Sequence, residues 1–186
     1  MIIGLTGTLG AGKGTVVEYL AQKKGFKHFA VSDTLLAGEA VKRGLEATRL
    51  VRQQIANEYR AKGPTKLQEA VYDMARADIE AGHDVFIEPQ HTVAEVQFIQ
   101  SIGGKVISVD ANLRIRYDRI KLRGSAKDNV SFEEFEKIQK EEMASDNPNK
   151  NNLAAAIAVA DFHVTNDGSF EELHAQIDDV LRKISE

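Results

Sequence analysis

The sequence lacks several residue types on which specialised folds and sites depend. Among its 186 residues are no cysteine, no tryptophan and only three prolines. The absence of cysteine excludes disulfide bonds, thiolate metal sites and a cysteine nucleophile, and it fits a reducing compartment. Aromatic residues make up 6% of the chain, which disfavours a surface that stacks bases. A chain of this length buries about 70% of its unfolded surface, so we expect it to fold on its hydrophobic core alone.

Long apolar runs and an excess of positive charge are also absent. No stretch approaches the roughly 20 apolar residues that cross a bilayer, and the first seven residues lack the basic leader and cleavage site of an export signal. The 24 Lys and Arg residues against 28 Asp and Glu residues give a net charge of -4, which disfavours general nucleic-acid binding. We therefore expect a cytoplasmic globular protein, monomer or dimer, with no membrane or nucleic-acid partner.

Apolar stretches of strand length alternate with stretches of helical periodicity along the chain. The five strand-like stretches cover residues 2–6, 26–32, 84–88, 104–110 and 162–166. Strands that alternate with helices predict βαβ crossovers and a parallel sheet with helices on both faces. We therefore predict one α/β domain over residues 1–186, with a three-layer α/β/α fold around a five-stranded parallel sheet.

Two connections between these strands are longer than a minimal crossover. Residues 33–82 carry a helical pattern interrupted by Gly44 and by Gly63-Pro64, which predicts three successive helices. Residues 124–152 are mostly charged and polar, with helical periodicity in their middle. Both stretches are where segments that cover a substrate are expected. Ser169 is predicted to cap a last amphipathic helix.

The first strand runs directly into a glycine-rich turn that opens the first helix. The turn reads Gly7-Thr8-Leu9-Gly10-Ala11-Gly12-Lys13-Gly14-Thr15 and satisfies the spacing G-x-x-x-x-G-K of a phosphate-binding loop. Glycines are needed because successive backbone N–H groups must point inward around a phosphate, where side chains would block the approach. The helix start adds its positive dipole end, and Lys13 supplies a mobile cation. Tight packing alone also uses such turns, but the motif, the strand and the helix together favour phosphate binding.

The residue after the loop lysine departs from the common pattern. Most loops of this type place a Ser or Thr there to bind Mg²⁺, whereas this chain has Gly14, with Thr15 one position later. The ending Gly-Lys-Gly-Thr resembles that of the nucleoside monophosphate kinases, a family that includes adenylate kinase. The resemblance implies a Mg²⁺ ion held largely through water and phosphate oxygens, and phosphoryl transfer to a small molecule.

Carboxylates follow the second and third predicted strands. Because the carboxyl ends of parallel strands meet at one edge of the sheet, we expect Asp33 and Glu88 to lie near the loop. Asp33 is either a helix cap or a carboxylate that orients, or takes a proton from, an attacking hydroxyl. Glu88 occupies the position at which P-loop proteins hold Mg²⁺ or its waters, the alternative being a solvated surface residue. His91 either contacts an acceptor phosphate or simply begins a loop.

Arginines gather on the helix predicted over residues 112–123. Arg116, Arg119 and Arg123 share one face by their spacing, whereas Arg114 is expected in solvent. Arg119 and Arg123 border the polar stretch that follows, where a closing lid would bring cations onto the transferring phosphoryl group. Four further arginines in the first long connection offer cations for an acceptor phosphate: Arg43, Arg49, Arg52 and Arg60.

Two segments resemble dephospho-CoA kinases, which are relatives of the nucleoside monophosphate kinases. They read Ile3-Gly4-Leu5-Thr6-Gly7 and Ala160-Asp161-Phe162-His163-Val164-Thr165-Asn166-Asp167-Gly168-Ser169. The resemblance covers nearly the whole chain and implies a P-loop kinase fold with a core, acceptor-binding helices in 33–82 and a lid in 124–152. It places Asn166 and Gly168 beside the adenine of ATP. The chain is also similar to small archaeal and bacterial kinase-like proteins, in which four of its site residues recur: Asp33, Glu88, Arg119 and Arg123.

The acceptor side departs from both kinase families. Dephospho-CoA kinases carry Asp-x-Asp after the second strand, where this chain has Val31-Ser32-Asp33. Adenylate kinases place a phosphate-binding arginine where Leu36 and Ala37 stand, and His91 falls about where relatives have an arginine. A protonated histidine would be a weaker and pH-dependent substitute. These changes either redirect the choice of acceptor or abolish transfer.

The sequence thus predicts an ATP- and Mg²⁺-dependent phosphotransferase. The loop and Lys13 are expected to bind the β- and γ-phosphates, and Thr15 and (through water) Glu88 to serve the metal. Asp33 is expected to orient or deprotonate the acceptor, and Arg119 and Arg123 to stabilise charge. The acceptor is expected to be a nucleotide-like small molecule, with a nucleoside monophosphate first and dephospho-CoA, phosphorylated on its 3′-hydroxyl, as the alternative. A nucleotide-binding regulatory protein without transfer activity is the alternative of a different class.

Overall fold

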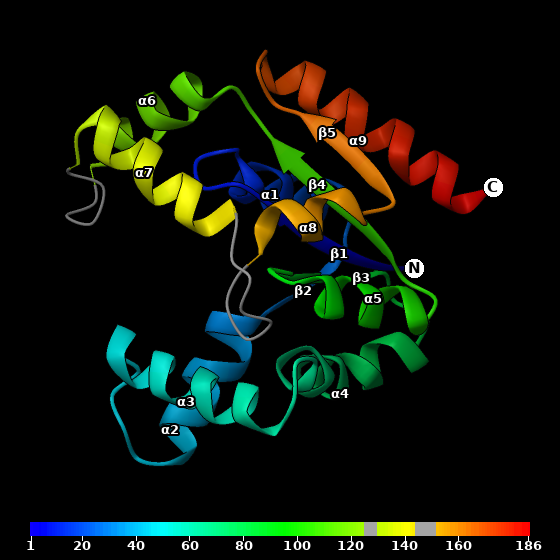
Figure 1. Cartoon of the computed structure of the whole chain (residues 1–186). Coiled ribbons are helices and arrows are strands. Elements are labelled where there is room, and N and C mark those ends of the chain that lie inside the picture. Colours follow the sequence, from blue (N-terminus) through cyan, green and yellow to red (C-terminus); the bar gives the residue numbers. More distant parts are fainter. Residues whose placement is uncertain (125–129, 144–151) are drawn as a thin grey trace.

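Five parallel strands form one sheet with β1 at its centre, in the order β2-β3-β1-β4-β5 (Figure 1). The structure is a computed structural model that describes residues 1–124, 130–143 and 152–186. The strands are β1 (Ile2–Gly7), β2 (Lys27–Ala30), β3 (Val85–Glu88), β4 (Lys105–Asp110) and β5 (Phe162–Thr165). All neighbouring pairs are parallel, as predicted. The chain changes from one half of the sheet to the other beside β1, which places the ligand crevice at the carboxyl end of that strand.

Helices connect the strands and cover both faces of the sheet. They are α1 (Lys13–Lys23), a π-helical turn η1 (Val31–Leu36), α2 (Ala37–Lys42), α3 (Arg49–Lys62), α4 (Lys66–Glu80), α5 (Val93–Ser101), α6 (Leu113–Arg123), α7 (Phe132–Met143), α8 (Leu153–Ala158) and α9 (Phe170–Ser185). In Figure 1, α6 and α7 stand on one side of the loop that follows β1, and α2 and α3 stand on the other.

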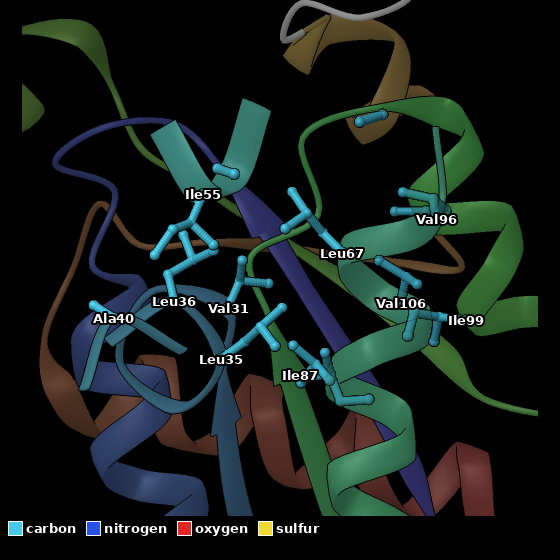
Figure 2. Packing of buried hydrophobic residues seen from close by; sticks show 14 residues of the cluster. Val31, Leu35, Leu36, Ala40, Ile55, Leu67, Ile87, Val96, Ile99 and Val106 are labelled. Atoms are coloured by element: carbon cyan, nitrogen blue, oxygen red, sulfur yellow. The ribbon is translucent and has the colours of Figure 1, made fainter. Parts of the chain in front are cut away.

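Successive residues of β3 and of β4 enter two separate hydrophobic cores. Phe86 and Ile107 belong to the core beneath α1 and α9. Their neighbours Ile87 and Val106 point the other way, into the core formed with η1, α3, α4, α5 and α8 (Figure 2). Because successive side chains of a strand point to opposite faces, a strand that is apolar at every position must be covered on both sides. The sheet is therefore the middle of three layers.

Capping boxes begin the described helices α5 and α9. At α9, the Ser169 hydroxyl accepts a hydrogen bond from the Glu172 N–H, and the Glu172 carboxylate accepts one from the Ser169 N–H. Thr92 and Glu95 form the same capping box at α5. Each box satisfies backbone donors that a helix start otherwise leaves unpaired. The predicted Ser169 cap is thereby confirmed.

The second strand is shorter than the sequence predicts. Of the apolar stretch 26–32, only Lys27–Ala30 is extended, because Val31 begins η1. Val31 and Leu35 are buried in this helical turn, so apolar residues that are typical of a buried strand reach the core from a helix instead. Asp33 consequently lies in the first turn of η1 rather than directly after a strand.

Two further differences concern the segment around the predicted lid at 124–152. The sequence does not predict α8, whose six residues are too few to show helical periodicity, although Ala156 is fully buried. Within the predicted lid, α7 is described and carries the buried Phe135, whereas residues 125–129 and 144–151 lie outside the described residues. The lid function of this stretch stays a prediction.

Within the described ranges, no helix has both the length and the apolar character needed to cross a membrane.

Asp161 joins three elements at the start of β5. Its Oδ2 accepts hydrogen bonds from the Val106 N–H at 2.9 Å and from Gln100 Nε2 at 3.1 Å, and its Oδ1 lies 3.2 Å from Lys105 Nζ. Burial by itself would raise the pKa of this carboxyl, but the Val106 N–H, the Gln100 amide and the Lys105 ammonium outweigh it and lower the pKa. The charged form therefore stabilises the fold.

We predict that Asp161→Asn lowers the free energy of unfolding by about 1–2 kcal/mol at pH 7, because a neutral amide is a weaker acceptor. Folding lowers the pKa of Asp161. The ionised carboxylate therefore adds to the free energy of unfolding at pH values above the unfolded pKa of about 3.9, and this addition is lost as the pH falls through the folded pKa. Urea denaturation between pH 7 and pH 3 should show the two proteins converging at low pH. Asp73→Asn, at a side chain that is 63% exposed, is the control. A loss that stays constant down to pH 3 would contradict the electrostatic origin.

Candidate active site

The loop between β1 and α1 has a backbone that glycine adopts far more readily than other residues. Gly7 and Gly12 have φ angles of 141° and 97°, which side chains strongly disfavour. A Cβ at Gly7 would overlap the carbonyl oxygen of Val109, and one at Gly12 would overlap the side-chain nitrogen of Asn166. Gly14, by contrast, has open space beside it. The geometry therefore requires the two glycines that define the motif.

Side chains bind the carbonyl groups of this loop. The hydrogen bonds, donor first, are Lys13 Nζ to Gly7 O (2.6 Å) and to Thr8 O (2.9 Å), Arg116 Nη1 to Leu9 O (3.3 Å) and Asn166 Nδ2 to Ala11 O (2.8 Å). Because N–H and C=O of one peptide point in opposite directions, bound carbonyls help to orient the loop N–H groups toward a ligand. At the end of the loop, α1 begins with no capping side chain and no acidic residue in its first turn. The positive end of α1 is therefore suited to an anion at this position.

A cavity of about 510 Å³ opens over the loop. This loop cavity is formed by the loop itself, the end of β3, α6 and the segment from the end of β5 to the start of α9. Its lining residues are Thr8, Leu9, Gly10, Gly12, Lys13, Gly14, Thr15, Glu88, Arg119, Ile120, Arg123, Asn166 and Phe170. Most of the predicted site residues therefore come together. Gly7 and Ala11 belong to the loop without lining the cavity, and Asp33 and Gly168 are not part of its lining.

Glu88 ends β3 at the edge of the loop cavity, with its side chain 19% exposed. Its Oε1 lies 3.1 Å from Nε2 of His28, whose ring stacks on Phe86 with 4.5 Å between the centroids. Within the part of the chain that is described, no three His, Asp or Glu side chains form a cluster that could hold a metal. A single carboxylate beside a phosphate loop fits Mg²⁺, which keeps several waters and binds through one or two carboxylates plus phosphate oxygens.

Arg119 and Arg123 both line the loop cavity. Arg119 Nη2 donates to Asn166 Oδ1 at 3.4 Å, whereas its buried Nη1 has no hydrogen-bond partner among the residues that the structure describes. A buried donor left unpaired costs about 1–3 kcal/mol, which an acceptor atom of a ligand in the cavity would recover. These two cations lie where the sequence predicts charge stabilisation.

Arg116 does not join the other two arginines in the cavity. It is 7% exposed, and its Nε donates to Ala111 O at 2.9 Å. Its Nη1 donates to Leu9 O of the loop and to the side-chain oxygen of Gln139 on α7. Spacing places the three arginines on one face of α6, but the long, flexible side chain decides where each charge lies. Arg116 therefore connects the loop to α7.

The two residues predicted beside the adenine have other contacts. Asn166 is 3% exposed, and both ends of its amide are bound, Nδ2 to Ala11 O and Oδ1 to Arg119. At Gly168, a Cβ would overlap the carboxylate of Glu172, which closes the cap of α9. Asn166 thus supports the loop and Gly168 makes room for the cap. Their contact with a base stays a prediction.

A second cavity of about 590 Å³ lies between η1, α3, α4 and the segment after β3. Three arginines of α3 line this arginine cavity, together with an apolar floor and several amides. Its lining residues are Val31, Ser32, Leu36, Ala47, Arg49, Arg52, Gln53, Ala56, Arg60, Leu67, Gln68, Pro89, His91 and Glu95. Of the arginines considered for an acceptor phosphate, Arg43 lies outside and pairs with two glutamates.

Asp33 forms an ion pair with Arg52 and does not line the loop cavity. Arg52 Nη1 lies 2.6 Å from Asp33 Oδ1 and also donates to the Ser32 hydroxyl at 3.0 Å. The Asp33 side chain is 76% exposed. The carboxylate lines neither of the two cavities, and the N-cap of η1 is Ala30 rather than Asp33. The catalytic role of Asp33 stays a prediction.

His91 lines the arginine cavity on the side of the loop lysine. Burial, followed by the positive charges of Lys13 and Arg60, lowers the pKa of His91 to about 4, so that its ring is neutral at pH 7. The neighbouring Glu95 accepts a hydrogen bond from the His91 N–H at 2.6 Å, and burial raises the pKa of Glu95. A neutral ring does not replace the cation that an arginine would supply at this position.

Three residues of the two cavities are not singled out by the sequence. The Thr8 hydroxyl donates a hydrogen bond to the carboxylate of Asp110 at the end of β4. The position of Asp110 at the end of a predicted strand is a sequence signal that could have identified this pair. Gln68 on α4 is buried, and its Nε2 donates to Pro89 O at 3.0 Å while its Oε1 has no partner. Phe170 is 63% exposed in the first turn of α9 and lines the loop cavity. No local pattern identifies the last two.

A family model described as AAA domain matches residues 3–144 of the chain. Among similar proteins is a UPF0200 protein from Thermococcus gammatolerans, 28% identical over 189 residues that cover 99% of this chain and 95% of the relative. Another UPF0200 protein, from Methanocaldococcus jannaschii, is 28% identical over 186 residues that cover 99% of this chain and 90% of the relative. Both relatives match over nearly their entire length.

Solved structures with a similar fold include kinases. Shikimate kinase from Aquifex aeolicus has a TM-score of 0.57 at 16% identity, covering 100% of this chain and 98% of that chain. Dephospho-CoA kinase from Campylobacter jejuni has a TM-score of 0.55 at 16% identity, covering 98% of this chain and 96% of that chain. The predicted P-loop kinase fold is thereby confirmed.

We predict that Gly12→Ala lowers the free energy of unfolding by about 2 kcal/mol or more, because the left-handed backbone strains an alanine and its Cβ meets Asn166. Gly14→Ala, at a helical position with open space, is the matched control and should raise stability by up to about 1 kcal/mol. Chemical denaturation of both variants beside the wild type measures the difference. Equal stability of the two variants would contradict the constraint assigned to Gly12.

Proposed function

Because the chain belongs to the AAA domain family and has the fold of a P-loop kinase, we propose that it is an ATP-dependent phosphotransferase. It transfers the γ-phosphoryl group of ATP to a nucleotide-like small molecule. The observation that carries the proposal is the proximity of two cavities at the loop lysine. Glu88 lines the loop cavity and the next residue, Pro89, lines the arginine cavity. Burial lowers the pKa of His91 in the arginine cavity, and the charge of Lys13 from the loop cavity lowers it further. One cavity fits the donor and the other the acceptor.

The loop cavity has the features that a polyphosphate donor requires. The loop N–H groups and the start of α1 are suited to the phosphate oxygens. Lys13 rests against the carbonyl oxygens of Gly7 and Thr8, and its flexible side chain brings the ammonium to the β- and γ-phosphates by rotation. Thr15, which lines the same cavity, adds a hydroxyl to the phosphate and metal contacts.

Glu88 would hold Mg²⁺ through water, and the Thr15 hydroxyl, which lines the same cavity, would be the second protein group to serve the ion. The positive charge of an ion held there would offset part of the negative charge of the phosphates. The His28 ring keeps Glu88 Oε1 in place at 3.1 Å. The arrangement of one carboxylate and one hydroxyl leaves the remaining ligands to water and phosphate, which agrees with the small number of protein ligands that Mg²⁺ uses.

The transfer step forms a bond from an acceptor oxygen to the γ-phosphorus. The bond from that phosphorus to the oxygen that bridges the β- and γ-phosphates breaks, and ADP leaves with the electron pair. Arg119 and Arg123 line the cavity on the side of α6, where their charges stabilise the equatorial oxygens of the transferring group. Such chemistry depends on positioning and electrostatics more than on covalent catalysis.

The arginine cavity favours a nucleoside monophosphate over dephospho-CoA as the acceptor. A phosphate acceptor needs cations, and Arg49 and Arg60 line the cavity with Arg52. A hydroxyl acceptor needs a base, but Asp33 is 76% exposed, paired with Arg52 and outside the lining. The neutral His91 weakens the cationic character of the site and favours the second candidate function, a nucleotide-binding regulatory protein without transfer activity.

We expect the purified protein to transfer label from γ-labelled ATP, in the presence of Mg²⁺, to at least one nucleoside monophosphate in a panel that includes dephospho-CoA. Lys13→Met should lower the rate at least about 100-fold, because it removes a cation that contacts the transferring group. Lys62→Met, at an exposed lysine outside both cavities, is the control. Label on dephospho-CoA instead would identify a hydroxyl acceptor, and ATP binding without any transfer would favour the regulatory protein.

We further predict that Arg60→Ala raises the KM for the acceptor at least about tenfold, because a charge-assisted contact to an anion contributes roughly 1.5–3 kcal/mol. The KM for ATP should change less than about twofold, since Arg60 lines the arginine cavity and does not line the loop cavity. Arg76→Ala removes an arginine that is 56% exposed and serves as the matched control in steady-state kinetics. Equal effects of Arg60→Ala on both KM values would contradict the division into donor and acceptor cavities.

A further inference from the structure

Phe170 is an exposed aromatic residue at the edge of the loop cavity. It is the first residue of α9, directly after the capping residue Ser169, and 63% of its surface is exposed. It lines the loop cavity together with Arg119 and Asn166. It also borders a smaller hollow of about 230 Å³ over α1, which it shares with Thr15. The ring therefore stands between two open spaces.

The hollow over α1 contains an aromatic pair of its own. Tyr19 and His174 stack with 3.9 Å between their centroids. Phe170 takes no part in that pair, and among the described residues its ring stacks on no other aromatic side chain. Of the described residues that line the loop cavity, Phe170 is the one aromatic. Its exposed face is thus a flat apolar surface at the end of the cavity formed by α6 and α9.

The side-chain amide in the loop cavity is already engaged. Asn166 Nδ2 is bound to Ala11 O of the loop, and Asn166 Oδ1 is bound to Arg119. Turning this amide toward a base edge would release the loop carbonyl, which would then need another partner. A nucleobase at this end of the cavity therefore meets an aromatic face, while the amide that would distinguish one base edge from another stays with the loop.

We propose that Phe170 is the platform on which the base of the donor nucleotide stacks, so that the site reads the face of the base and not its edge. The inference rests on the proposed function. Every base has a π-face, and stacking on an aromatic side chain tolerates changes of base. The protein consequently binds ATP and GTP with similar affinity.

The test is calorimetric titration of the full chain with Mg²⁺ complexes of ATP, GTP and inorganic tripolyphosphate. Phe170→Ala should weaken binding of both nucleotides about tenfold and leave tripolyphosphate binding within about twofold of the wild type. Phe170→Tyr, which keeps the ring, should restore nucleotide binding. Leu50→Ala, at an apolar side chain on α3 that is 69% exposed, is the matched control and should change none of the three.

Several results would overturn the inference. Unchanged ATP affinity in Phe170→Ala would show that the ring does not hold the base. A wild-type preference for ATP over GTP above about twentyfold would show that the site distinguishes the hydrogen-bonding edges of the two bases. Tripolyphosphate binding as tight as that of ATP overturns the inference alone and leaves the phosphate loop intact. A folded wild-type protein that binds none of the three overturns the proposed function and the inference with it.

Discussion

A loop can surround a phosphate with backbone N–H groups only if the carbonyl groups of the same peptides find partners elsewhere. In this protein the partners come from three places: the start of α1 supplies Lys13, α6 supplies Arg116, and the turn after β5 supplies Asn166. The loop also needs glycine at Gly7 and Gly12, where neighbouring atoms leave no room for a Cβ. The positions of α6 and β5 relative to β1 are therefore constrained by the requirement that the loop stay open.

Arg116 extends this constraint to α7. A buried guanidinium is tolerated only when its donors are bound, and here they reach Ala111, Leu9 and Gln139. The guanidinium also lies over the ring of Phe135, 5.8 Å from its centroid. Since Gln139 and Phe135 belong to α7, movement of that helix would change the partners of a charge that also holds the loop. The described part of the predicted lid is thus physically connected to the backbone of the glycine-rich loop.

The two cavities divide the charged residues between them. Arg119 and Arg123 lie on the loop side, and Arg49 and Arg60 lie on the other. Lys13 and Arg60 both act on His91, and together with burial they keep its pKa near 4. A histidine surrounded by cations loses its proton because a further positive charge there would be both desolvated and repelled. The site therefore takes its positive charge from arginine and lysine, and His91 adds a neutral ring.

The sequence alone determined the phosphate loop, the alternation of strands and helices and the Ser169 cap, because each depends on residues that are neighbours along the chain. The spacing of Gly12 and Lys13 and the pairing of Ser169 with Glu172 are local features. Only the tertiary structure decided that Arg116 is buried, that the Asn166 amide serves the loop, and that His91 is neutral. Asn166 is bound to a carbonyl 155 positions away, and Arg116 to one 107 positions away. Such contacts depend on the packing of the fold, which brings side chains that are distant in the sequence within a few ångströms of each other. A local sequence pattern therefore does not predict them.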